Sequence, residues 1–280
     1  MQDEVIIKPG GGWALPRWKT ITQNFDLLFV LVRREFLSKY RQTILGPAWY
    51  IAQPLFTGLI FTALFSSAAK MSTDGIPPLL FYFCGLLSWG YFVGCLEATA
   101  GSLVNNSALF QKVYFPRILV PLSLVIAKMY SYFVQLAVFL LFVAFYHLKS
   151  GTFSFHPNWT LAFYPLILVQ TAALALGVGL WVAALSTQYR DFHHLLGFAI
   201  QLWMYATPII YPLSLIQEKW RGWVLLNPMC AVTEAYRRMF FGVGGVSFAA
   251  HAWSAALTFF IIVTGLLMFQ RVERRFVDTL

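Results

Sequence analysis

Ionisable side chains occur at a few places within the long apolar stretches of this sequence. Glu97 and Lys128 lie in runs that are otherwise apolar, and a charge at membrane depth is costly enough to make its residue a candidate functional group. The alternative is structural: an ion pair, or a side chain that extends to the membrane surface. A further acidic residue, Glu234, precedes Arg237 and Arg238 by three and four residues. This spacing favours ion pairs along a helix.

Aromatic side chains make up 18% of the sequence, and their chemistry suits contact with sugars. Ring faces stack on sugar C–H groups, while tyrosine hydroxyls and indole N–H groups hydrogen-bond to sugar oxygens. Tryptophan and tyrosine also gather in belts at membrane surfaces, so contact with lipid is the alternative for each ring. The candidates for lining a path through the first three apolar stretches are Tyr50, Trp89, Tyr91, Phe92, Tyr130 and Tyr132.

Motifs for nucleotide, metal and nucleophilic chemistry are not recognisable in the sequence. The glycine-rich pieces GGGW and GVGGVS lack the GKS or GKT ending of a phosphate-binding loop. His193 and His194 lack HExxH-type spacing, and Cys84, Cys95 and Cys230 lack CxxC spacing. We therefore expect no catalytic residue, no metal and no cofactor on this chain. Any energy from ATP has to come from a separate chain.

The composition indicates an integral membrane protein. Of the 280 residues, 59% are hydrophobic and 11% are charged, whereas soluble domains have about 25% charged residues. Several apolar runs exceed the ~20 residues that cross the hydrocarbon, and they lack the period-two alternation of a transmembrane barrel. The net charge is +9, and 13 of the 20 Lys and Arg residues fall on one side of the predicted spans. This asymmetry predicts cytoplasmic termini and argues against nucleic acid as a partner.

The predicted fold is all-α, with six transmembrane helices in one permease domain, residues 44–280. Residues 1–19 are expected to form a flexible arm. Residues 20–43 are expected to form an amphipathic helix along the cytoplasmic surface, because apolar positions recur at helical spacing among charged ones; packing on a soluble partner is the alternative. Gly90 and Gly94 have the GxxxG spacing that permits close helix packing. The six spans are placed at residues 44–69, 79–104, 118–148, 161–186, 195–211 and 248–270.

Two segments between the spans have distinct compositions. Residues 105–117 form a short cytoplasmic segment whose apolar side chains are expected to be exposed and to need a partner. Residues 213–246 are too polar to cross and too apolar for a solvated loop. We expect two short helices there, broken at Asn227–Pro228, which enter the outer leaflet as a re-entrant hairpin.

Four stretches resemble, in order, motifs of permease subunits of ABC-type polysaccharide exporters. This family exports O-antigen, capsule and teichoic acid, and the O-antigen permeases are the most similar in appearance. The stretches are KYRQTILGPAWYIAQPL at 39–55, FQKVYFPRILVP at 110–121, YRDFHHLLGFAIQLWMYATPIIYP at 189–212 and NPMCAVTEAYR at 227–237.

The resemblance implies a bacterial inner-membrane exporter of an undecaprenyl-type lipid-linked polysaccharide. Two copies of the chain would work with two ATP-binding subunits, which bind ATP and Mg²⁺. Residues 105–117 would be the coupling helix, and residues 213–246 an outer gate. The implied ATPase contacts are Leu109, Phe110, Lys112, Val113, Tyr114 and Arg117, and the implied gate residues are Glu234, Tyr236, Arg237 and Arg238.

Two other functions stay open at this point. One is an ABC-type exporter permease of the same broad fold that carries a drug or a small lipid. The other is an integral-membrane glycosyltransferase or acyltransferase, although no loop with clustered Asp, Glu or His is present. A secondary transporter is disfavoured because no inverted repeat is evident.

Overall fold

The computed structural model describes residues 23–40, 48–112, 115–150, 159–187, 189 and 191–277, and in these ranges it is helical without strands. Five helical stretches are long and apolar enough to cross a membrane. They correspond to five of the six predicted spans. The stretches are Trp49–Ala68, Pro78–Ala100, Leu119–Lys149, Trp159–Ser186 and Phe248–Val272.

The remaining predicted span, residues 195–211, contains a shorter helix than expected. Helix α9 (Asp191–Tyr205) has 15 residues, or about 22 Å at 1.5 Å per residue, whereas the hydrocarbon is ~30 Å thick. The helix ends before Pro208, which cannot donate the next helical hydrogen bond. At this end the Thr207 hydroxyl donates to the Trp203 carbonyl at 2.8 Å. The prediction of a helix continuing to Tyr211 is therefore wrong.

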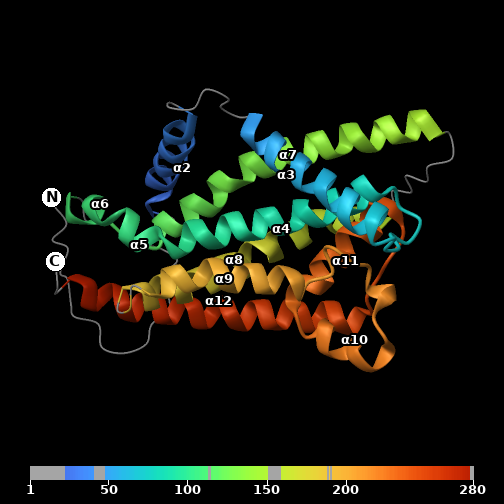
Figure 1. Ribbon diagram of the computed structural model, residues 1–280. Coiled ribbons are helices and arrows are strands. Elements are labelled where there is room, and N and C mark those ends of the chain that lie inside the picture. Colours follow the sequence, from blue (N-terminus) through green and yellow to red (C-terminus); the bar gives the residue numbers. More distant parts are fainter. Residues whose placement is uncertain are drawn as a thin grey trace.

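Helix α4 (Pro78–Ala100) lies at the centre of the bundle (Figure 1). Its sequence is apolar on all sides, which is the pattern of a helix surrounded by others, and every residue from Leu79 to Trp89 is buried. It packs against α8 (Tyr164–Ser186), α7 (Leu119–Ser150) and α3 (Trp49–Phe61), while α12 (Phe248–Val277) packs chiefly on α8. A π-helical turn, η2 (Thr62–Ala68), continues α3, and a 3-10 turn, η3 (Trp159–Phe163), precedes α8.

Glycines allow α8 to approach both of its neighbours closely. A Cβ placed on Gly177 would lie 2.8 Å from the Ile262 Cα of α12, and one on Gly179 would lie 2.5 Å from the Thr99 Cβ of α4. The GxxxG pair of α4 does not play this part. A Cβ on Gly94 would only reach the Lys128 side chain at 3.5 Å, so the packing role predicted for Gly90 and Gly94 is wrong.

Three short elements lie at the same end of the bundle as the last turns of α12 (Figure 1). They are α2 (Phe25–Tyr40), α5 (Ser102–Asn105) and α6 (Ser107–Lys112). Helix α2 packs on α7 through the buried Leu28 and Leu31, while Phe25, Phe29 and Val30 are exposed. Residues 1–22 and 41–47, which include the predicted flexible arm, lie outside the described residues.

A helical hairpin precedes α12 at the opposite end of the bundle (Figure 1). It consists of the turn η4 (Leu213–Leu215), α10 (Glu218–Leu225) and α11 (Pro228–Phe241). The break between α10 and α11 falls at Asn227–Pro228, as expected from the sequence. Helix α11 is almost entirely buried against α4 and α12, whereas no residue of α10 is buried.

Candidate functional site

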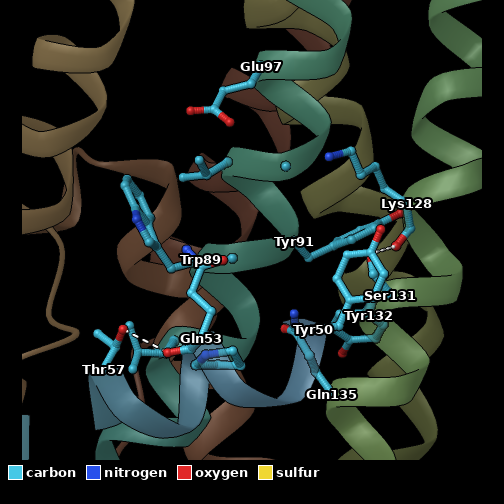
Figure 2. A pocket seen from close by; sticks show the side chains of 15 residues that line it. Tyr50, Gln53, Thr57, Trp89, Tyr91, Glu97, Lys128, Ser131, Tyr132 and Gln135 are labelled. Carbon is cyan, nitrogen blue, oxygen red and sulfur yellow. Dashed lines mark hydrogen bonds between the residues drawn. The ribbon is translucent and has the colours of Figure 1, made fainter. Parts of the chain in front are cut away.

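A cavity of about 360 Å³ lies between α3, α4 and α7. Its wall combines aromatic rings, amides and hydroxyls with two charged side chains (Figure 2). Such a surface offers both stacking faces and hydrogen-bonding groups, so it suits a polar ligand with apolar faces. The lining residues are Tyr50, Gln53, Pro54, Thr57, Leu86, Trp89, Gly90, Tyr91, Val93, Gly94, Glu97, Lys128, Ser131, Tyr132 and Gln135.

The cavity brings together four of the aromatic residues predicted for the path: Tyr50 from α3, Trp89 and Tyr91 from α4, and Tyr132 from α7. The other two lie elsewhere. Phe92 is fully buried, with its ring centroid 5.0 Å from that of Trp203. Tyr130 is exposed, with its ring edge-on to Phe36 at 4.6 Å. A path role for the first four stays a prediction.

Polar side chains of α3 and α7 face each other across the cavity (Figure 2). Two of them are fixed by bonds to their own helices: the Thr57 hydroxyl donates to the Gln53 carbonyl at 2.9 Å, and the Ser131 hydroxyl donates to the Lys128 carbonyl at 2.8 Å. Gly90 of α4 lies opposite Gln135 in the cavity wall, where an added Cβ would be 3.8 Å from the Gln135 amide oxygen and would fit without a clash.

Glu97 and Lys128 both line the cavity, as the two charges predicted at membrane depth. Figure 2 shows Lys128 extending from α7 toward α4, with Glu97 pointing away from α7. Within the described part of the chain, the two side chains are not within 4 Å of each other as an ion pair. The two charges therefore remain separate groups of the cavity wall.

Tyr132 connects the cavity to the helical hairpin. Its hydroxyl hydrogen-bonds to the Tyr236 hydroxyl of α11 at 2.8 Å and to the Tyr164 hydroxyl at the start of α8. Its ring packs on that of Tyr91, with centroids 4.9 Å apart. Tyr132 and Tyr236 are both fully buried. A residue predicted for the path and one predicted for the gate are thus in direct contact.

The predicted ion pair between Glu234 and Arg237 is present in α11. The Arg237 Nη1 atom donates to Glu234 Oε1 at 2.7 Å, and both side chains are 2% exposed. Arg237 Nη2 also donates to the Ile209 carbonyl at 3.1 Å, and its guanidinium carbon lies 3.8 Å from the centroid of the Phe81 ring. The backbone N–H of Gly245 donates to Glu234 Oε2 at 3.3 Å. Through these contacts the pair connects α11 with Phe81 of α4 and with Ile209, which precedes α10.

Arg238 differs from the other predicted gate residues. It is exposed, and its guanidinium lies beside Gly245, where an added Cβ would be 3.2 Å from Nη1. Within the described residues, the Glu234 carboxylate contacts the Arg237 guanidinium and the backbone N–H of Gly245. The alternative pairing of Glu234 with Arg238 is therefore not the one that forms.

The side chain of Asn227 forms a junction that sequence reasoning missed. Its Oδ1 accepts from Trp203 Nε1 at 2.9 Å and from the Met229 backbone N–H at 3.0 Å. Its Nδ2 donates to the Ala206 carbonyl at 3.2 Å and to the Thr207 hydroxyl at 2.9 Å. Asparagine before proline is a helix-start signal, but the contacts with the end of α9 require the tertiary fold.

Phe110, in the segment predicted to contact an ATPase subunit, is less exposed than expected. Phe110 is buried, with its ring centroid 5.8 Å from that of Phe115 and 5.3 Å from the Arg117 guanidinium carbon. The expectation that Phe110 is exposed is therefore wrong, because these two neighbours cover its ring. Leu109 is half-buried. The Lys112 side chain, Val113 and Tyr114 lie outside the described residues.

Helix α2 holds the start of this segment through a contact that the sequence did not indicate. Arg34 Nη2 donates to Asn106 Oδ1 at 2.8 Å, and Asn106 Nδ2 donates to the Ser102 carbonyl at 3.1 Å. The Asn106 carbonyl also accepts from the backbone N–H groups of Leu109 and Phe110. Asn106 thus links α2, α5 and α6.

A multi-pass helical bundle with a polar cavity between its spans has the features of a membrane transport protein. Comparison with known proteins defines the family: residues 26–241 match the model described as ABC-2 type transporter. The chain belongs to this family.

Three curated relatives share the name O-antigen export system permease protein RfbA. The one from Myxococcus xanthus is 30% identical over 225 residues, which cover 80% of this chain and 83% of the relative. Two from Klebsiella pneumoniae are 25% identical over 257 and 256 residues, each covering 91% of this chain and 95% of the relative. The sequence resemblance to permeases of this kind is confirmed.

Proposed function

We propose that this chain is the transmembrane subunit of an ATP-driven exporter, which moves an O-antigen-like, lipid-linked polysaccharide out of the cytoplasm across a bacterial inner membrane. The observation that carries the proposal is the cavity, where Tyr50, Trp89, Tyr91 and Tyr132 form one wall together with the amides of α3 and α7. Rings that stack on sugar faces, next to groups that hydrogen-bond to sugar hydroxyls, would bind successive sugars of a polymer weakly and in the same way. The names of the three relatives support the same substrate class.

The proposed topology has six crossings and cytoplasmic termini. Helix α9 serves as a short fifth crossing, completed by the turn at residues 206–212, and α2 lies along the cytoplasmic surface. The mixed exposure of α2 supports this placement, because Phe25 and Phe29 are exposed among charged residues such as Arg33 and Arg34. The hairpin of α10 and α11 enters the outer leaflet and closes the path.

The proposed assembly contains two copies of this chain and two ATP-binding subunits, which hold ATP and Mg²⁺. A second copy has an apolar surface available on α3 and η2, where Phe56, Leu59 and Ile60 of α3 and Leu64 of η2 are exposed. The segment α5–α6 is the proposed contact with the ATP-binding subunit. The hydrogen bond between Arg34 of α2 and Asn106 would transmit a displacement of α6 to the transmembrane helices.

Reconstitution with the partner ATPase tests this proposal. We expect polyprenyl-linked glycan, but not a panel of hydrophobic drugs, to stimulate ATP hydrolysis and to become protected inside inverted vesicles. Stimulation by drugs alone would assign the chain to a drug exporter instead.

A pair of aromatic variants on α3 tests the cavity. Tyr50→Ala removes a ring from the cavity wall, and a lost stacking contact of ~0.5–1.5 kcal/mol lowers glycan transport about two- to tenfold. Trp49→Ala is the matched control, because Trp49 is exposed on the same helix and does not line the cavity. Equal transport by both variants would remove the cavity from the proposed path.

A further inference from the structure

The Lys128 side chain lies inside the cavity, along the face of α4 that carries Gly90 and Gly94. It belongs to the span Leu119–Lys149. A Cβ on Gly94 would lie 3.5 Å from its Cδ, 3.6 Å from its Nζ and 3.9 Å from its Cε. The aliphatic part of Lys128 therefore packs against Gly94, and the ammonium group is held at the cavity wall and not at a membrane surface.

The Lys128 ammonium has no carboxylate within ion-pair distance in the described part of the chain. Among the described residues, it makes neither an ion pair nor a side-chain hydrogen bond. The other charge in the cavity, Glu97, points away from α7 in Figure 2. An uncompensated ammonium at membrane depth is costly, and a cavity that admits a ligand offers a way to compensate it.

The rest of the cavity suits a polar, negatively charged group. A volume of about 360 Å³ corresponds to about twelve water molecules at ~30 Å³ each, which is larger than a phosphate group. The Gln53 and Gln135 amides supply neutral donors within the same cavity. A phosphate prefers a cation with additional donors around it.

We propose that Lys128 forms an anion site in this cavity, and that its ligand is the phosphate-class group of a lipid-linked substrate. The lipid-borne source rests on the proposed export function, whereas the anion site rests on the geometry alone. The amides and the rings of Tyr50 and Tyr132 then contact the sugar next to that phosphate.

Binding measurements on the full-length chain in lipid nanodiscs test this site. Three probes separate the sources of the anion: polyprenyl pyrophosphate, the neutral polyprenol of the same length, and inorganic pyrophosphate. We expect the pyrophosphate lipid to bind about tenfold or more tighter than the polyprenol, the range for a charge-assisted hydrogen bond. Lys128→Met should remove the difference, Lys128→Arg should keep it, and Glu97→Gln should not weaken it.

Undiminished preference for the pyrophosphate lipid in Lys128→Met would overturn the anion site. Competition by inorganic pyrophosphate at a concentration equal to that of the lipid form would support an anion site but assign it to free phosphate. A phosphate-free glycan provides the separate test of function. If the wild type and Lys128→Met both bind this glycan while the anion preference is unaffected by the substitution, the site fails and the proposed export function stands.

Discussion

The buried pair of Glu234 and Arg237 makes the sharpest prediction about the helical hairpin. Glu234→Gln keeps the size of the side chain but removes its charge. Arg237, which is 2% exposed, then has a neutral amide oxygen in place of the carboxylate, beside the Ile209 carbonyl and the Phe81 ring. The Gly245 backbone N–H also faces a weaker acceptor than a carboxylate.

The expected cost follows from the burial of both groups. Removing one partner of a buried ion pair destabilises a protein by about 3–5 kcal/mol, because the other charge stays desolvated. Since α11 is held to α4 by this pair, we expect much of the cost to appear as opening of the hairpin. A change of ~3 kcal/mol corresponds to a roughly hundredfold larger open population.

The native thiol of Cys230 reports this opening. Cys230 lies on α11, four residues before Glu234, and is fully buried. Cys84 and Cys95 are also buried free thiols, so the measurement uses a Cys84→Ala, Cys95→Ala background. In that background we expect Glu234→Gln to raise the rate of Cys230 modification by a small maleimide about a hundredfold.

The matched control for the hairpin is Glu218→Gln, because Glu218 is exposed on α10. It should leave the Cys230 rate within about twofold of the parent, as for most surface substitutions. The reasoning is refuted if Glu234→Gln and Glu218→Gln have the same rate and the same melting temperature. In that case the buried pair neither closes nor stabilises the hairpin.

Three further predictions address other parts of the bundle. Gly177→Val places the new side chain against the Ile262 backbone and should lower the free energy of unfolding by at least about 1–3 kcal/mol, measured as a lower melting temperature. Gly197→Val is the control and should cost less, because no atom lies within 4 Å of an added Cβ at that position. Tyr132→Phe removes the hydroxyl bonded to Tyr236 and should destabilise the hairpin by about 1–2 kcal/mol; an unchanged Cys230 rate would contradict the link. Leu109→Asp, at a half-buried position of α6, should leave membrane insertion and ATP hydrolysis intact but reduce export, and normal export would count against α6 as the coupling element.

Hydropathy and local spacing were sufficient to predict the long spans and the polar pair of α11. The apolar runs mark five stretches that the structure forms as long helices, and the three-residue spacing of Glu234 and Arg237 indicates their bond. Both signals are local. The end of α9 differs from the predicted span because the segment after Tyr205 is also apolar, so that hydropathy alone does not show that the helix ends before Pro208.

Contacts between distant residues could not be read from local patterns. The GxxxG spacing in α4 indicated helix packing, but Gly90 and Gly94 line the cavity, while Gly177 and Gly179 make the close approaches. The spacing shows that small residues share one face of a helix. It does not show which neighbouring helix packs on that face. The bond between Tyr132 and Tyr236 likewise joins residues 104 positions apart, and the three contacts of Asn227 with Trp203, Ala206 and Thr207 appear only when α9 and α11 are folded together.

Capture of the glycan inside the cavity tests the central proposal most directly. A photo-crosslinking amino acid at Gly90, an exposed position in the cavity wall, should crosslink to polyprenyl-linked glycan in vesicles that contain the partner ATPase and ATP. The same amino acid at Ile60, which is exposed on α3 outside the cavity lining, should not. ATP-dependent capture at Gly90 alone is the result that we predict. Efficient export with no glycan captured at Gly90 would contradict the assignment of this cavity to the transport path.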